Sequence, residues 1–185
     1  MTTAAVVLAA GGASRFAGER HKLVSDFRGR PLVAWALDHA LRAGLDATAV
    51  VTGAVDLHGL VPARVCVVHN ERWADGQASS LLAAVQWARV GGFDAIVVGL
   101  GDQPLVPPEA WTTVAASTSP IAVAEYGGHR SPPTRLASAV WPLLSGTGDA
   151  GARSLMAERP DLVEQLACPG QAIDIDTVED LARWS

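Results

Sequence analysis

The sequence predicts an α/β fold in which a mostly parallel β-sheet is covered by helices on both faces. Short, entirely apolar runs alternate with longer segments whose apolar residues recur every three to four positions. Runs that are apolar at every residue are typical of parallel strands buried on both faces, and their alternation with helices indicates βαβ units. Such folds bind ligands beyond the carboxyl ends of their strands, so the residues that directly follow the strands are the functional candidates.

The first half of the chain gives the alternation in order. Residues 4–10 form the first expected strand, and a polar, glycine-bearing loop follows over 11–30. Pro31 suits the first position of a helix over 32–42, and Gly44 suits its end. The next expected elements are strands over 48–52 and 65–68 and a helix over 79–90.

The second half begins as regularly, with a strand over 94–98, a helix from Pro107 to about 116 and a strand over 120–126. Less regular segments follow over 135–144, 150–158 and 162–167. The last expected element is a helix over 177–184, with Thr177 or Asp176 as its N-cap.

Composition narrows the class of protein. The 185 residues suit one domain over 1–185, and 49% hydrophobic against 18% charged residues excludes a disordered chain. A net charge of −5 disfavours a nucleic-acid binder. No apolar run reaches the roughly 18 residues of a membrane span, and no basic residue precedes the first one, so we expect a cytoplasmic protein without a membrane partner. Cys66 and Cys168 form no CxxC pair, and the histidines show no zinc spacing.

A glycine-rich segment directly follows the first strand. It runs Leu8-Ala9-Ala10-Gly11-Gly12, with Ser14, Arg15 and Lys22 downstream. Two adjacent glycines let the backbone approach a ligand closely, successive N–H groups can cradle phosphate oxygens, and the two cations add positive charge. The alternative is a surface turn with solvated charges. A Walker P-loop is excluded because no Gly-Lys-Ser/Thr follows.

Two aspartates are candidates for metal binding. Asp102 lies in Gly99-Leu-Gly-Asp-Gln-Pro104 after the strand over 94–98, and Asp176 follows a strand-like run over 172–175. Magnesium held mainly by phosphates takes only one or two protein carboxylates. The alternatives are a turn aspartate at Asp102 and a helix N-cap at Asp176.

The segment from Asn70 to Ser80 follows the third strand and contains Gly76. Asn70 and Ser79 or Ser80 could read a base or sugar, although the serines in isolation are better explained as a helix N-cap. Trp73 is the one tryptophan that we expect near a ligand; Trp35, Trp87, Trp111 and Trp141 suit packing.

Two later loops are candidates for a second substrate. The stretch from Gly146 to Arg153 contains G-x-G-x-x-G, but no clean strand precedes it, which argues against a dinucleotide site. A loop and helix start with Arg153 aimed at an anionic substrate fits better. His129 and Arg130 lie in a segment, residues 126–133, that suits a substrate loop or a polar turn.

In their order along nearly the whole chain, these motifs resemble those of the nucleotidyltransferases that attach a nucleotide to the molybdenum cofactor, within the MobA-like NTP transferase superfamily. The closest branch is the molybdenum cofactor cytidylyltransferases. The resemblance rests on five motifs: Leu8 to Gly11 with Ser14, Arg15 and Lys22; Asn70, Trp73, Gly76, Ser79 and Ser80; Asp102, Gln103 and Pro104; Gly148 to Arg153; and Asp174 to Asp180.

The resemblance implies a single-domain, Rossmann-like three-layer α/β/α sandwich and a magnesium-dependent transfer of CMP from CTP to the terminal phosphate of molybdopterin. It implies Arg15, Lys22 and Asp102 as catalytic residues, and Asp102 and Asp176 as Mg²⁺ ligands. Nucleotide binding would involve Leu8, Ala9, Ala10, Gly11, Gly12, Ser14, Arg15, Lys22, Asn70, Gly76, Ser79 and Ser80. The acceptor would meet Gly148, Asp149, Arg153 and His129.

Several alternatives stay open. The loop between Arg15 and Lys22 is longer than expected of the family, so Arg20 competes with Lys22 for the phosphates. Ala10 favours CTP, and a glycine there would favour GTP. Another phosphorylated acceptor, such as a sugar or polyol phosphate or phospholactate, would leave the same phosphate loop. A non-catalytic protein that carries the molybdenum cofactor to a recipient molybdoenzyme is a third hypothesis.

Overall fold

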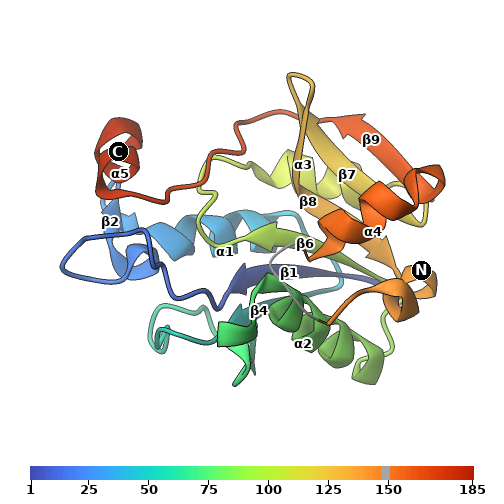
Figure 1. Ribbon diagram of the computed structural model, residues 1–185, viewed down its shortest axis with the longest axis horizontal. Helices are drawn as coiled ribbons and strands as arrows, with labels where there is room; N and C mark the ends of the chain where they lie inside the picture. Colours follow the sequence, from blue (N-terminus) through green and yellow to red (C-terminus); the bar gives the residue numbers. More distant parts are fainter. Residues whose placement is uncertain (147–150) are drawn as a thin grey trace.

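A mixed β-sheet divides the protein into layers in the computed structural model, which describes residues 1–146 and 151–185 (Figure 1). Within those residues the sheet has seven strands in the order β5-β4-β1-β6-β8-β7-β9. Their bounds are β1 Thr3–Ala9, β4 Ala47–Thr52, β5 Cys66–His69, β6 Ala95–Leu100, β7 Ile121–Tyr126, β8 His129–Ala137 and β9 Val163–Ala167. All neighbouring strands pair in parallel except β8, which is antiparallel to both β6 and β7. The expected mostly parallel sheet is confirmed.

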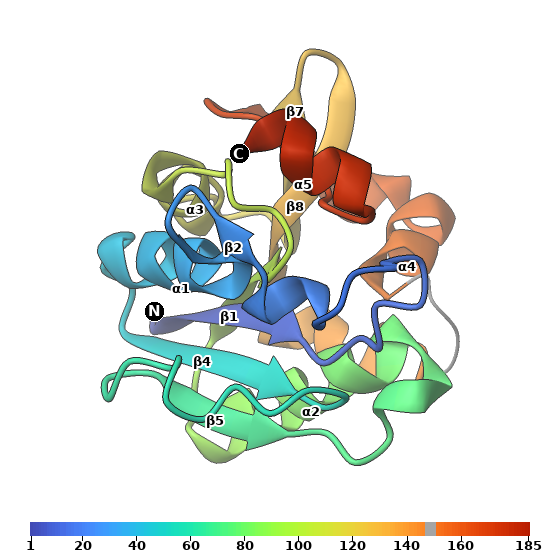
Figure 2. The same cartoon turned by 90° about the vertical axis from the view of Figure 1, so that its left-hand side faces the viewer.

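Helices cover both faces of the sheet because successive strand residues point to opposite sides. Val7 of β1 packs in one core with α1 (Leu32–Arg42) and α3 (Pro108–Ala115). Its neighbour Val6 packs in the other core with α2 (Gln77–Val90) and α4 (Ala152–Glu158). Figure 2 shows α1 and α3 on one side of β1 and α2 on the other. The expected three-layer α/β/α sandwich is therefore confirmed.

A third, smaller core joins the two ends of the chain. Phe27 of the short hairpin formed by β2 (Asp26–Phe27) and β3 (Arg30–Pro31) is fully buried with Leu32 and Ile175. The last helix, α5 (Val178–Trp184), packs on this core through Leu181 and Trp184. In both ribbon views α5 lies beside β2 (Figures 1 and 2). The early loop and the C-terminal segment are thus held together.

Three sequence expectations are wrong. The segment over 126–133, expected as a loop or polar turn, contains the first part of strand β8, which continues into the segment expected to be irregular from 135. Pro132 and Pro133 fall where the β7–β8 register shifts, so neither proline interrupts the paired residues. Helix α2 begins at Gln77, which puts Ser79 inside its first turn and not at the N-cap. Residues 172–175 are not a strand, because that segment is held by single contacts to the loop after β6.

Four 3₁₀ turns complete the described residues: η1 Lys22–Val24, η2 Trp73–Asp75, η3 Ser138–Leu143 and η4 Pro160–Leu162. The first two of them carry Lys22 and Trp73 at the carboxyl edge of the sheet. No helix among the described residues is long and apolar enough to cross a membrane.

Candidate functional site

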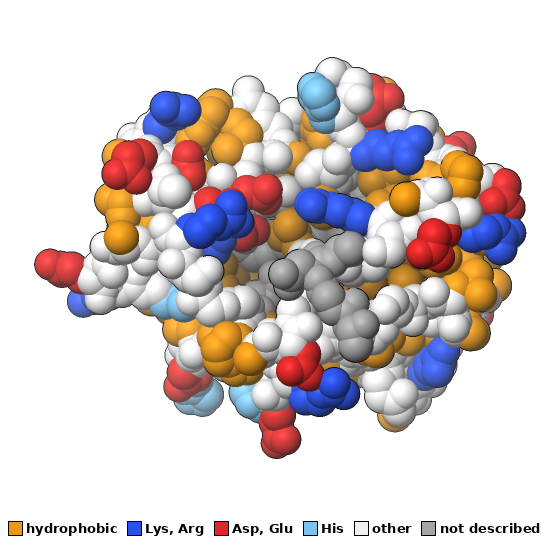
Figure 3. Space-filling view, in the orientation of Figure 1, with side chains coloured by type: hydrophobic (Ala, Val, Ile, Leu, Met, Phe, Trp, Pro, Cys, Tyr) orange, Lys and Arg blue, Asp and Glu red, His pale blue; other side chains and the backbone are white. Residues whose placement is uncertain are grey.

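A pocket of about 450 Å³ lies beyond the carboxyl ends of β1 and β6. It collects segments from both halves of the chain, as expected for ligand sites in open α/β sheets. Its lining comprises Leu8, Ala9, Ala10, Gly11, Gly12, Ala13, Ser14, Arg15, Lys22, Leu23, Trp73, Ala74, Gly76, Gln77, Ser80, Leu100, Asp102 and Asp176. The space-filling view shows Lys or Arg side chains directly next to acidic ones near the middle of this face (Figure 3).

The glycine turn after β1 packs directly on Trp73. A Cβ atom on Gly12 would lie 2.9 Å from the Trp73 ring, and one on Gly53 would lie 2.6 Å from the Trp73 Cβ. Both contacts are closer than real Cβ atoms come, so only glycine fits at these two positions. The Ala54 N–H donates to the Ala10 carbonyl at 3.0 Å and fixes the turn from below. The indole therefore forms one wall of the pocket.

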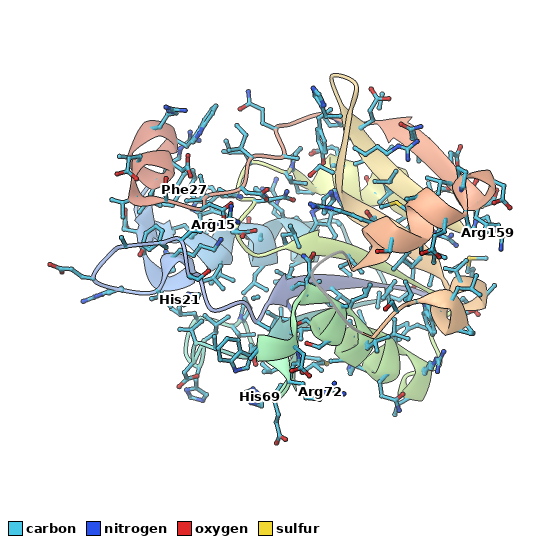
Figure 4. The ribbon with its side chains drawn as sticks, viewed as in Figure 1. Arg15, His21, Phe27, His69, Arg72 and Arg159 are labelled. Atoms are coloured by element: carbon cyan, nitrogen blue, oxygen red, sulfur yellow. The ribbon has the colours of Figure 1, made fainter. Side chains whose placement is uncertain are left out.

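Lys22 joins two aspartates that are distant in the sequence. Its Nζ lies 2.7 Å from Oδ2 of Asp102 and 2.8 Å from Oδ1 of Asp176. Arg15 reaches the other oxygen of Asp176 at 2.9 Å, and Figure 4 shows Arg15 on the N-terminal loop facing the segment that leads to α5. Lys22 is only 9% exposed. Burial lowers its pKa, but the charges and hydrogen bonds of Asp102 and Asp176 outweigh that effect and raise it, so Lys22 stays cationic.

Backbone contacts hold Asp176 in place. The N–H of Ile175 donates to the Asp102 carbonyl at 3.0 Å. On the other side, Thr177 is the N-cap of α5 and forms a capping box with Asp180. Asp176 therefore need not serve as the cap, and its carboxylate is left to face the pocket.

Gln103 ties this edge of the sheet to the C-terminal segment. It is 3% exposed, and its Nε2 donates to Oδ1 of Asp174 at 2.9 Å and to Ser131 at 3.1 Å. Burial, followed by the charge of Asp102, raises the pKa of Asp174. Asp174 does not line the pocket; it anchors the segment that carries Asp176.

Asn70 and the two serines form a buried support. The Asn70 Nδ2 donates to the hydroxyls of Ser79 and Ser80 at 2.9 and 3.0 Å. Its Oδ1 accepts from the Arg72 N–H at 3.0 Å. Ser80 and Gly76 line the pocket, whereas Asn70 and Ser79 do not. Asn70 therefore stabilises the loop that carries Trp73.

The two carboxylates meet the basic requirement of a divalent-cation site. Asp102 and Asp176 supply hard oxygen ligands that converge on one position, because a single ammonium group contacts both. Within residues 1–146 and 151–185, no group of three or more His, Cys, Asp or Glu could hold a metal. A metal here would need further oxygens from a ligand such as a phosphate.

A second pocket of about 240 Å³ adjoins the first and shares Leu8, Gln77 and Leu100 with it. Its remaining lining is mainly aliphatic and comes from β6, β7, β8, α2 and α4: Leu81, Val98, Val123, Arg130, Ser131, Pro132, Thr134, Leu136, Gly151, Ala152, Arg153, Met156 and Ala157. The guanidinium groups of Arg130 and Arg153 are its charged side chains.

The structure separates the residues expected to meet the second substrate. Arg153 lines the second pocket, whereas exposed His129 belongs to a different hollow beside Tyr126 and Cys168. Gly148 and Asp149 lie outside the described residues. Gln77 was not among the expected site residues, and Arg130 was named with His129 only as part of a segment that suits a substrate loop or a polar turn. Had 129–137 been recognised as a strand, its alternation would have put Arg130 on the face opposite to His129.

The structure also separates Lys22 from Arg20. Lys22 lines the first pocket, and exposed Arg20 does not. The extra residues of this loop therefore place Lys22, and not Arg20, beside the two aspartates.

Residues 5–164 match the model of the MobA-like NTP transferase domain. Over 195 aligned residues, 96% of this chain and 94% of its relative, the chain is 32% identical to nicotine blue oxidoreductase of Paenarthrobacter nicotinovorans. It is 32% identical over 145 residues to molybdenum cofactor guanylyltransferase of Cereibacter sphaeroides, which covers 74% of this chain and 68% of that one.

Among solved structures, Rv0371c of Mycobacterium tuberculosis H37Rv superposes with a TM-score of 0.84 at 29% identity, over 99% of this chain and 97% of that one. A second structure of Rv0371c is a complex with manganese, with a TM-score of 0.75 at 28% identity over 100% and 98% of the chains. Asp174, Asp176 and α5 lie beyond the residues that match the domain model.

Proposed function

The chain belongs to the MobA-like NTP transferase family, and we propose that it transfers CMP from CTP to the terminal phosphate of a molybdopterin-type acceptor and releases pyrophosphate. The observation that carries the proposal is the meeting of the glycine turn, two cations and two carboxylates in one pocket that opens into a second, arginine-bearing pocket. A site for two anionic substrates needs this combination, because like charges must be neutralised before they can approach.

The first pocket would hold the triphosphate. Backbone N–H groups of the turn at Gly11 and Gly12 can bind phosphate oxygens, and Arg15 and Lys22 can form charge-assisted hydrogen bonds to them. The acceptor phosphate is ionised at neutral pH, so the attack on the α-phosphate requires no general base. What the residues must do is align the attacking and leaving oxygens and neutralise their charge.

Asp102 and Asp176 would hold a magnesium ion together with the phosphates. When bound, the ion would stabilise the negative charge that develops on the leaving pyrophosphate. The manganese complex of Rv0371c supports a divalent metal in a related structure.

The second pocket would hold the acceptor. Arg130 and Arg153 suit its anionic groups, and the aliphatic walls suit a ring system. The mostly aliphatic lining offers few partners for the many hydroxyls of a sugar or polyol phosphate, and each hydroxyl left without a partner would cost about 1–3 kcal/mol. The pterin rings of molybdopterin agree better with these walls than an acceptor rich in hydroxyls.

The proposal of CTP as the nucleotide rests on Ala10 in the glycine turn and on Trp73 beside it. Ala10 is nearly fully buried beneath the turn, and its side chain favours CTP over GTP by family resemblance. Trp73 forms the wall on which a pyrimidine could stack. The guanylyltransferase relative makes GTP the competing nucleotide.

The test compares CTP, GTP, ATP and UTP, each with magnesium, for their effect on the melting temperature. A ligand that binds only the folded state raises it. We expect the largest shift with CTP, followed by pyrophosphate release when molybdopterin is added. A shift with GTP alone would change the base and keep the reaction class. No shift with any nucleotide, or binding without pyrophosphate release, would favour the cofactor-carrier hypothesis.

Because one relative is named an oxidoreductase, the melting-temperature test should also include redox cofactors. NADH and NADPH should be included in the same measurement. A shift with NADPH and none with the triphosphates would replace nucleotidyl transfer by a redox reaction. The ion-paired Lys22, Asp102 and Asp176 support the transfer reaction, because hydride transfer has no need of paired carboxylates.

A further inference from the structure

The contacts of Lys22 and Arg15 cover the carboxylates that a metal would need. Asp176 gives one oxygen to Lys22 and the other to Arg15, and Asp102 gives Oδ2 to Lys22. Three of the four oxygens of these two carboxylates are therefore bonded to cationic side chains. The Lys22 ammonium occupies the position on which both carboxylates converge, so a divalent metal can take that position only after Lys22 has moved.

The charge of the cluster also disfavours a free metal ion. Asp102 and Asp176 carry two negative charges, which Lys22 and Arg15 balance. Two further carboxylates are near: Asp174 accepts from Gln103, and Asp180 accepts from the backbone N–H groups of Asp176 and Thr177. Neither of them lines the pocket. The charged side chains that line the pocket therefore carry no net negative charge to attract a divalent ion, whose dehydration is costly.

A triphosphate changes this balance. Arg15 and Lys22 line the same pocket as the glycine turn, so phosphate oxygens that enter the turn come within reach of both cations. A triphosphate carries several negative charges and attracts them strongly. Each cation that turns towards the phosphates uncovers an oxygen of Asp102 or Asp176.

We propose that Lys22 occupies the metal position between Asp102 and Asp176 until a nucleoside triphosphate draws it away, so that metal and nucleotide bind as a mutually dependent pair. The inference rests on the proposed function for the identity of the nucleotide. Such a dependence is reciprocal: the factor by which nucleotide tightens metal binding equals the factor by which metal tightens nucleotide binding.

The test uses Mn²⁺ alone, with free ion measured by electron paramagnetic resonance and no nucleotide present. Lys22→Met keeps a long side chain and removes the charge, and it should bind Mn²⁺ at least about tenfold more tightly than the wild type. Lys22→Arg keeps the charge and should behave like the wild type. Arg20→Met removes the exposed cation of the same loop and should also change nothing. Adding Asp102→Asn to Lys22→Met should abolish the gain.

Wild-type protein that binds Mn²⁺ as tightly as Lys22→Met would overturn the inference. If Lys22→Met does not fold, Arg15→Met is the second variant. The Arg15 side chain is 75% exposed, so its replacement should leave the fold intact, and the substitution frees one oxygen of Asp176. It should give a smaller gain in Mn²⁺ affinity in the same direction, and no gain would count against the inference.

Pyrophosphate release separates this inference from the proposed reaction. If the Mn²⁺ pattern appears but CTP and molybdopterin yield no pyrophosphate, the transfer reaction fails and the role of Lys22 stands. If pyrophosphate is released while the wild type binds Mn²⁺ tightly without nucleotide, the reaction stands and the role of Lys22 fails.

Discussion

The backbone N–H of Ile175 donates to the carbonyl of Asp102 at 3.0 Å, which joins the C-terminal segment to the loop that follows β6. Ile175 is fully buried with Phe27. Asp102 and Asp176 therefore keep a fixed relation to one another although 74 positions separate them in the sequence. This link positions the two carboxylates of the candidate site relative to one another.

Asp102→Asn should reduce turnover by at least about a hundredfold and leave the fold intact, because it removes a carboxylate from the proposed metal site. Turnover is measured as pyrophosphate release at saturating magnesium. Asp161→Asn, which changes an exposed carboxylate bonded to Arg159, is the control. Normal turnover in Asp102→Asn would remove this residue from the metal site.

Arg153→Ala and Arg130→Ala should each raise the apparent KM for the acceptor about tenfold, more than that for CTP, because each removes a charge-assisted contact to an anion. His129→Ala is the matched control for Arg130→Ala, because His129 is the adjacent residue of β8 and does not line the second pocket. A larger effect on the KM for CTP would move the arginine to the nucleotide side.

Phe27→Ala should lower the free energy of unfolding by about 3–5 kcal/mol, the usual cost of removing a buried aromatic ring. Phe27 is fully buried in the core that joins the hairpin to the C-terminal segment. Denaturant titration measures the loss, and CTP affinity should fall with it because Lys22 and Asp176 flank this core. Unchanged stability would show that α5 does not depend on the hairpin.

Gly53→Ala should destabilise the protein by about 1–3 kcal/mol, because its Cβ would lie 2.8 Å from the Ala10 carbonyl oxygen and 2.6 Å from the Trp73 Cβ. Gly11→Ala is the control for stability, since nothing lies within 4 Å of a Cβ at that position. Equal melting temperatures for the two variants would contradict the packing of Trp73 on this turn.

The pKa of Asp174 predicts a pH effect on stability. Its folded-state pKa is raised by burial and by Asp102 above the ordinary 3.8. The native state therefore holds its proton to higher pH than the unfolded chain, and stability is lost as pH rises from about 3.8 through the folded pKa. Asp174→Asn should flatten this fall and increase stability at pH 7. Denaturant titrations at pH 4 and 7 test this, and parallel curves for the two proteins would contradict it.

The parts of the fold that the sequence predicted well are those with local signals. Residues 4–10 and 32–42 agree with β1 and α1 to within one residue, because an apolar run and a helical period bounded by proline and glycine are readable locally. Strand β8 was missed because Pro132 and Pro133 argue against a strand, and only the register shift opposite them makes it possible.

The residues of the candidate site also fall into those with a local sequence signal and those without one. The turn at Gly11, the cation Lys22 and Asp102 were recognisable because they follow strands or complete a motif. The separation of Lys22 from Arg20 could not be predicted, because it depends on how the loop folds against Asp176, 154 positions from Lys22. Arg130 could not be assigned without knowing which way β8 faces.

Asp176 lies near the end of the sequence, and its link to Asp102 has a consequence during protein synthesis. A growing chain can form β1, β4 and β6 and their covering helices while residues beyond 164 are still inside the ribosome. At that stage Lys22 has one carboxylate partner, Asp102, and Phe27 lacks the cover of Ile175. The pair of carboxylates becomes complete only when the segment with Asp176 emerges, so an unfinished chain would lack one of the two aspartates of the proposed metal site.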